Sequence, residues 1–128
     1  DLTTTAAKVS AQTAFAMAGL KPADIDVAQI YDCFTICALM TLEAYGFCAK
    51  GEGGHFVEGG RIELGGDLPI NTSGGLLSET GMPGMQLVLE GVRQMRGDSV
   101  NQVRGARTCA VSNQGGIMHT HSTLLLGN

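Results

Sequence analysis

Three polar corners, each following a run of apolar residues, carry the side chains best suited to chemistry. They are residues 31–34 (Tyr-Asp-Cys-Phe), residues 71–75 (Asn-Thr-Ser-Gly-Gly) and residues 112–116 (Ser-Asn-Gln-Gly-Gly). Ligands in open α/β sheets bind outside the carboxyl ends of strands, where turning loops meet. Glycine lets a backbone come close to a ligand or to another loop. Three such corners in a chain of 128 residues predict a built site.

Within these corners, Tyr31 is the first candidate for chemistry. Its hydroxyl can donate a proton, or its half-buried ring can simply bind a backbone group. Asp32 is expected to cap the helix that follows, because aspartate there accepts a backbone N–H. A loop-orienting or close-packing role, with substrate contact as the alternative, is assigned to six residues: Asn71, Ser73, Gly74, Gly75, Gly115 and Gly116.

Two further candidates lie near the end of the chain. His119 and His121 are two residues apart, so they point to one face of an extended segment and can shuttle a proton or bind a metal. No carboxylate or cysteine is near them in sequence, and we assign no metal site. Ser112 lacks the histidine and acid pattern of an activated nucleophile, so a polar turn residue is its default role.

Charge and cysteine content exclude several classes of protein. The net charge is −4 and the eight Lys and Arg residues are scattered, which disfavours a binder of nucleic acid, since that requires a basic stripe. No apolar run reaches the ~18 residues needed to span a bilayer. Four cysteines without Cys-x-x-Cys spacing and without a secretion signal predict free, packed thiols in a reducing cytoplasm.

The elements that position these corners follow from hydrophobic periodicity. The pattern predicts helices over residues 3–20, 34–45 and 85–95, and strands over 25–31, 68–71, 107–112 and 122–126. Residues 56–64 are predicted to form a small hairpin around two glycines. The order of elements predicts a single α/β domain over residues 1–128, with a mixed sheet.

Several stretches, in a consistent order over essentially the whole chain, resemble the carboxyl-terminal half of thiolases, which include the acetyl-CoA acetyltransferases. The most similar branch is the sterol-carrier or lipid-transfer type. The matching stretches are residues 18–26, 31–35, 46–48, 50–54, 68–75 and 93–97. The resemblance implies one half of the thiolase fold, an acyl-CoA thioester as substrate and no covalently bound cofactor.

The family's site residues transfer only in part. The resemblance places the nucleophilic cysteine in an amino-terminal half, so the chain alone is expected to be inert. Tyr31 stands where histidine or asparagine is usual, and no histidine is present at residues 81–84. Ser112 stands in place of the family's second catalytic cysteine. Tyr31, Ser112 and His121 therefore remain the candidate catalytic residues, and ordinary thiolase chemistry is in doubt.

A related branch of the family cleaves carbon–carbon bonds of CoA thioesters by a retro-aldol route. Its members resemble thiolases without the catalytic cysteine and histidine, use tyrosines as acid or base, and pair with a zinc-ribbon and OB-fold protein. Tyr31 matches one such tyrosine, but Gly81 stands where the second is expected. Thiolase-like chemistry, retro-aldol cleavage and a non-catalytic scaffold thus all stay open.

The resemblance also carries expectations about assembly. The amino-terminal thiolase half and a second copy of the chain are the expected partners. The resemblance implies that the chain begins after the first strand of the family fold, which we place at the centre of the sheet. A vacant central position would leave unpaired N–H and C=O groups, which are costly when buried.

Overall fold

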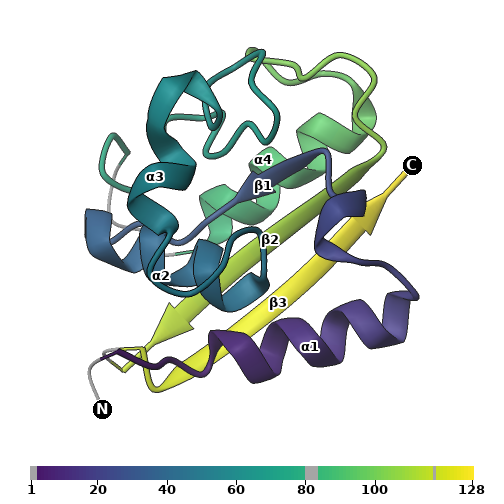
Figure 1. Ribbon diagram of the computed structural model, residues 1–128. Helices are drawn as coiled ribbons and strands as arrows, with labels where there is room; N and C mark the ends of the chain where they lie inside the picture. Colours follow the sequence, from purple (N-terminus) through teal and green to yellow (C-terminus); the bar gives the residue numbers. More distant parts are fainter. Residues whose placement is uncertain (1–2, 80–83, 117) are drawn as a thin grey trace.

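A computed structural model describes residues 3–79, 84–116 and 118–128 as an α/β domain (Figure 1). Its helices and strands, in chain order, are α1 (Ala7–Ala18), β1 (Val27–Gln29), α2 (Thr35–Tyr45), α3 (Gly53–Val57), α4 (Met85–Arg96), β2 (Thr108–Gly115) and β3 (Thr120–Gly127), with short 3₁₀ turns at Pro22–Asp24 and Glu58–Gly60. No helix in the described ranges is long and apolar enough to cross a membrane.

The sheet is mixed and has the order β1-β2-β3. β1 is parallel to β2, with Ala28 opposite Ala110, and β2 is antiparallel to β3, with Val111 opposite Leu124. The strand predicted at residues 68–71 is reduced to a single parallel bridge between Ile70 and Ala28. The carboxyl ends of β1 and β2 therefore meet at one edge, as the three polar corners require.

Helices cover both faces of this sheet (Figure 1). On one face, α1 and α2 pack on the sheet through a cluster that includes Phe15, Leu42, Ile30 and Ala110. On the other face, Leu87 of α4 packs against sheet residues that include Val27, Cys109 and Val111. All three residues of β1 are buried because the strand is covered on both faces.

The expected gap in the middle of the sheet is not found. β1 pairs directly with β2, and β2 pairs directly with β3 along eight residues of each strand. On its other side, β1 is bridged by Ile70. Among the described residues, the unpaired edge of the strands is the outer edge of β3, so any strand added to this sheet adds at its rim.

The hairpin predicted at residues 56–64 is also wrong. Residues 53–60 form α3 and a 3₁₀ turn, since the N–H of Gly53 binds Glu43 Oε1 of α2 at 2.9 Å and Phe56 packs on the core. Gly59 and Gly60 both have positive φ, as a hairpin turn would require, but here they lie in a 3₁₀ turn that leads into a compact loop. Its backbone closes through the N–H of Leu68, which donates to the Arg61 carbonyl at 3.0 Å.

The three long predicted helices are confirmed with shorter or shifted ends. Each ends at a glycine in the left-handed conformation, at Gly19, Gly46 and Gly97. Glycine is the residue that adopts this conformation without a steric penalty. The last two strands are confirmed and are longer than predicted, so β2 carries residues 112–115 of the third polar corner at its end.

Candidate functional site

The side chain of Asn71 holds the backbone at the end of β1. Its Oδ1 accepts a hydrogen bond from the N–H of Ile30 at 2.7 Å, and its Nδ2 donates to the Ile30 carbonyl at 3.0 Å. Asn71 itself has φ of 50°, a left-handed conformation that asparagine tolerates better than most residues. The Asn71 side chain thus makes the two hydrogen bonds to Ile30 that a neighbouring strand would otherwise make, just before Tyr31.

Ser112 supports the same corner from the other neighbour of β1. Its Oγ accepts a hydrogen bond from the N–H of Tyr31 at 2.8 Å, and the residue is fully buried. Burial raises the pKa of the Tyr45 hydroxyl, and hydrogen bonds with Thr123 and Ser112 offset part of that rise. The structure therefore places Ser112 behind Tyr31.

Asp32 does not cap α2 as predicted. Its Oδ1 accepts a hydrogen bond from the N–H of Leu76 at 2.7 Å, whereas the residue before α2 is Phe34, which offers no capping side chain. The carboxylate is buried by the loop of residues 71–76. Gly75 makes this approach possible, because a Cβ built on it meets Asp32 Cγ at 2.8 Å and Asn71 Nδ2 at 2.9 Å.

The three predicted corners therefore converge on residues 30–33, and a pocket of about 540 Å³ opens beside them. Its lining combines Tyr31 with the start of α4, the end of β2 and the start of β3; the residues are Tyr31, Gly84, Met85, Val88, Asn113, Gln114, Gly115, Thr120, His121 and Ser122. A smaller hollow of about 240 Å³ adjoins Tyr31 and is lined also by Cys33, Phe34, Cys37, Gln114, Gly115, Gly116 and Met118. Tyr31 is thus shared by both cavities.

Burial and neighbouring thiols raise the pKa of Tyr31. Desolvation is the main cause that raises the pKa of its hydroxyl, and the nearby Cys33 and Cys37 raise it further. A tyrosine of ordinary pKa is already protonated at neutral pH, so the raised pKa leaves the Tyr31 phenol as a proton carrier there.

His121 lines the pocket from β3 and is fixed by Tyr45. Its Nε2 lies 3.0 Å from the Tyr45 hydroxyl, which also lies 2.7 Å from Thr123 Oγ1. Burial lowers the pKa of His121 to about 4, so the imidazole is neutral at pH 7. His119, by contrast, is exposed.

Gln114 is a pocket residue that the sequence analysis did not single out. It stands opposite His121 in the β2–β3 register, and its Nε2 donates to Cys33 Sγ at 3.3 Å. Gln114 Oε1 and His121 Nδ1 are both buried without a partner among the described residues, which leaves two polar atoms free beside the pocket. The sequence does hold a signal for Gln114, because it lies two residues after Ser112 and so on the same face of the strand.

The remaining predicted loop residues divide into two groups. Gly115 and Gly116 line the cavities. Asn71, Ser73, Gly74 and Gly75 line neither and lie behind the corner, where Gly74 packs with its Cβ position 3.1 Å from Ser78. The prediction for residues 81–83 lies outside the described part of the chain.

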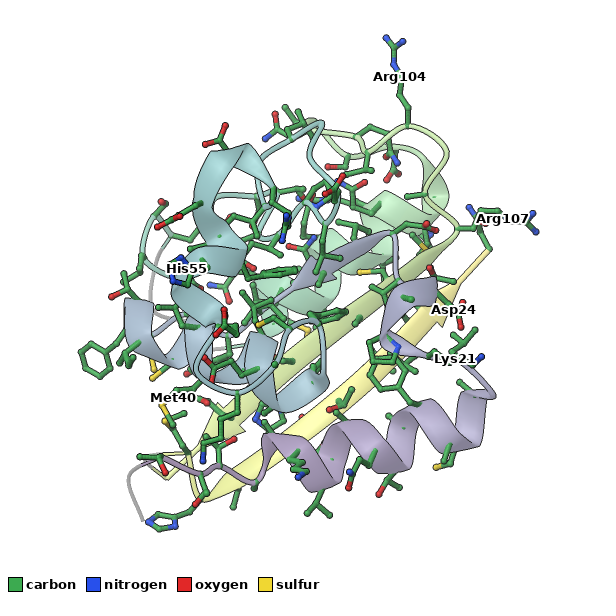
Figure 2. All side chains as sticks on the ribbon, viewed as in Figure 1. Lys21, Asp24, Met40, His55, Arg104 and Arg107 are labelled. Carbon is green, nitrogen blue, oxygen red and sulfur yellow. The ribbon has the colours of Figure 1, made fainter. Side chains whose placement is uncertain are left out.

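Charged groups are sparse at the pocket. No Lys or Arg from the described ranges lines it. Figure 2 shows Arg104 and Arg107 extending outward near the start of β2, whereas the pocket lies at the other end of that strand. The described residues contain no group of three or more His, Cys, Asp and Glu placed to hold a metal ion.

Comparison with known proteins assigns the chain to a family. The family model described as "Thiolase C-terminal domain-like" matches residues 1–128. The chain belongs to this family. Its similarity to a solved structure described as "Ltp2-ChsH2(DUF35) aldolase" supports the same fold, with a TM-score of 0.89 and 42% identity over 94% of this chain and 31% of that one.

Curated relatives of this thiolase C-terminal domain include a lyase, an aldolase and a transferase. The chain is 49% identical to "17-hydroxy-3-oxo-4-pregnene-20-carboxyl-CoA lyase" of Mycobacterium tuberculosis, over 88% of its length and 29% of that protein's. It is 50% identical to "Steroid side-chain-cleaving aldolase" of Thermomonospora curvata, over 71% and 23%. It is 41% identical to "Acetyl-CoA acetyltransferase" of Methanothermobacter thermautotrophicus, over 91% and 32%. The chain therefore spans about a third or less of these relatives.

The tight contact at Gly75 predicts a large effect of a single methyl group. Gly75→Ala adds a Cβ against Asp32 and Asn71 at a residue with φ of 70°. We expect the free energy of unfolding to fall by about 2–4 kcal/mol. Gly105→Ala is the matched control, because Gly105 has φ of 76° and open space around its Cβ position, and it should cost only about 1 kcal/mol. Equal losses in urea unfolding would contradict the packing described for this corner.

The depressed pKa of His121 predicts a specific dependence of stability on pH. As pH falls from 6.5 towards 4, the unfolded chain protonates this histidine and the folded chain does not, so stability is present above pH 6.5 and declines below it. His121→Gln should reduce the difference in unfolding free energy between pH 7 and pH 5 by about 1 kcal/mol, allowing for partial exposure. His119→Gln, at an exposed position, should leave the difference unchanged. A His121→Gln profile that matches the wild type would refute the assignment.

Proposed function

We propose that this domain contributes the Tyr31 side of an active site that cleaves a carbon–carbon bond next to a CoA thioester by a retro-aldol step. The observation that carries the proposal is the contrast between Tyr31 and Ser112. The tyrosine side chain lines the pocket, whereas Ser112 is fully buried with its Oγ bound to the Tyr31 N–H. A tyrosine-based chemistry therefore fits this site better than one that uses residue 112.

The retro-aldol step balances with one proton donor and one acceptor. The β-hydroxyl of the acyl-CoA loses its proton, the bond between the α- and β-carbons breaks, and its electron pair forms the enolate of the thioester. The β-carbon leaves as a carbonyl group, and the α-carbon takes a proton. Because Tyr31 lines the pocket and a phenol holds its proton at neutral pH, we assign it the donation of this proton to the α-carbon of the enolate. The base that takes the hydroxyl proton, and later returns a proton to Tyr31, is assigned to the rest of the protein.

His121 and Gln114 are proposed to support this step without exchanging protons. The imidazole is neutral at pH 7 because of its lowered pKa, and its Nδ1 lies beside the pocket without a partner in the described chain. Neutral, prepositioned hydrogen-bonding groups stabilise developing charge without the cost of reorganising water. In the tautomer whose Nε2 accepts from the Tyr45 hydroxyl, the Nδ1–H of His121 suits the oxygen of the thioester. The free Oε1 of Gln114 is an acceptor and suits the β-hydroxyl of the substrate instead.

The partners of this domain are proposed from its relatives. The relatives described as a CoA lyase and an aldolase are about 50% identical to the chain, which supports an acyl-CoA substrate. The structure described as "Ltp2-ChsH2(DUF35) aldolase" supports pairing with a second protein, for which we infer the OB-fold class. An amino-terminal thiolase half, a homodimer and a cytoplasmic location complete the proposal.

Removal of one hydroxyl tests the role of Tyr31. In the full protein, Tyr31→Phe should lower kcat for cleavage of a β-hydroxyacyl-CoA by about 100-fold or more, measured as release of the carbonyl product. The thermal midpoint should not change, because Tyr31 binds Ser112 through its backbone N–H, which the substitution keeps. Thr13→Val is the control, because it removes an exposed hydroxyl that donates to the Val9 carbonyl away from the pocket, and it should leave kcat unchanged.

Two outcomes would overturn the proposal. One is an unchanged kcat in Tyr31→Phe. The other is turnover of acetoacetyl-CoA with free CoA by the full protein, which would favour the acetyltransferase relative. The 128-residue chain alone should be inert in both assays.

A further inference from the structure

Three sulfur atoms from separate parts of the chain meet beside Tyr31. Cys33 follows β1, Cys37 lies in the first turn of α2, and Met118 lies in the turn between β2 and β3. Cys33 Sγ and Cys37 Sγ are 3.7 Å apart, and Cys37 Sγ is 3.8 Å from Met118 Sδ. Cys48 and Cys109 have no such sulfur neighbour in the part of the chain that the structure describes.

These distances match the spacing of sulfur ligands around one metal ion. With metal–sulfur bonds of about 2.3 Å, two ligating sulfurs lie about 3.8–4.0 Å apart. Cys37 thus already has ligand spacing to both Cys33 and Met118, and a shared ion requires Cys33 Sγ and Met118 Sδ to lie at the same spacing from each other. The hollow of about 240 Å³ that all three residues line gives the ion a path from outside, and Cys33 and Met118 are only half buried.

The identity of the ligands selects the kind of ion. Thiolate and thioether sulfurs are soft donors that favour Cu(I), and thioethers are weak ligands for hard cations. A structural zinc site uses four protein ligands, whereas three sulfurs gather here among the described residues. No carboxylate from those residues lines the hollow, which disfavours calcium and magnesium.

We propose that Cys33, Cys37 and Met118 form a binding site for a soft monovalent cation, with Cu(I) as the ion that fits it best. On binding, the two thiols lose their protons to solvent and form two metal–thiolate bonds, and the Met118 thioether completes a three-coordinate site. No electron is transferred. The inference is independent of the retro-aldol proposal, since it rests only on the sulfur positions and the hollow.

Gln114 adds a positioning contact to this site. Its Nε2 donates a hydrogen bond to Cys33 Sγ at 3.3 Å. Burial and the neighbouring Cys37 raise the pKa of Cys33 overall, and the bond from Gln114 opposes part of that rise. The same side chain lines the larger pocket. An ion bound to the three sulfurs would therefore sit on the wall shared by the two cavities.

The test is an anaerobic titration of the full protein with Cu(I), in competition with a chromogenic Cu(I) chelator. Cys33→Ser and Cys37→Ser should each bind one equivalent less than the wild type. Met118→Leu, which keeps the side-chain volume, should weaken that equivalent about tenfold while the thermal midpoint stays constant. Cys48→Ser is the matched control and should keep the wild-type stoichiometry and affinity.

X-ray absorption at the copper edge gives a second readout. The loaded wild type should show three sulfur neighbours at about 2.3 Å, and Met118→Leu should show two. The inference is overturned if Cys33→Ser binds as many equivalents as the wild type, if Cys48→Ser loses the site, or if Met118→Leu leaves affinity and spectrum unchanged. If Cys37→Ser does not fold, the number of Cu(I) equivalents bound by Cys33→Ser decides the test, because Cys33 is only half buried.

Discussion

The geometry of the site depends on how the backbone polar groups at the end of β1 find partners. β1 is only three residues long, yet the residues that follow it remain buried. A buried N–H or C=O without a partner is costly, and here the side chains of Asn71 and Ser112 supply what a longer strand would have supplied, while Asp32 ties the corner to the next loop. Asn71 binds both polar groups of Ile30, Ser112 accepts from the N–H of Tyr31, and Asp32 accepts from the N–H of Leu76. The corner at Tyr31 is thereby fixed without blocking its hydroxyl.

A buried polar network fixes the loop that carries Asn71. Thr72 Oγ1 donates to Glu90 Oε1 at 2.6 Å and accepts from Gln29 Nε2 at 3.0 Å. Gln94 Nε2 also reaches Thr72 Oγ1 at 3.0 Å, and Asn101 Nδ2 donates to the Thr72 carbonyl at 2.7 Å. Because Glu90 and Gln94 lie on α4, this network couples the helix that forms one wall of the pocket to the loop that holds Tyr31 in place. Removal of a partner within such a network leaves a buried group unsatisfied and costs more than one exposed hydrogen bond.

The parts of this structure that the sequence predicts are those set by local periodicity and by glycine. The long helices and their glycine ends follow from apolar spacing, and the three corners follow from polar residues after apolar runs. Interactions between distant residues could not be predicted in this way. Asp32 binds Leu76 in a loop more than forty residues away, so local capping rules gave the wrong partner. The pair of Gly59 and Gly60 fits a hairpin turn in sequence, but the bond from Gly53 to Glu43 directs that segment into a helix.

The side chains proposed for the site show the same division. Tyr31 and His121 are predicted as candidates from their types and places, whereas Gln114 becomes a candidate only through the β2–β3 register that sets it opposite His121. The sulfur trio is likewise invisible in sequence, because Met118 is distant from both cysteines and reaches them only through the turn after β2. Ser112 shows the reverse case, since its place in the family motif suggested chemistry and its burial assigns it to support.

The account depends most directly on the position of Tyr31 relative to a bound thioester. A crystal structure of the full protein with a non-cleavable β-hydroxyacyl-CoA analogue measures this position. We expect the Tyr31 hydroxyl oxygen within about 3.0–3.5 Å of the α-carbon, close enough for proton transfer, with Ser112 Oγ still bound to the Tyr31 N–H. A thioester bound away from Tyr31, or a Ser112 side chain turned into contact with it, would contradict the account.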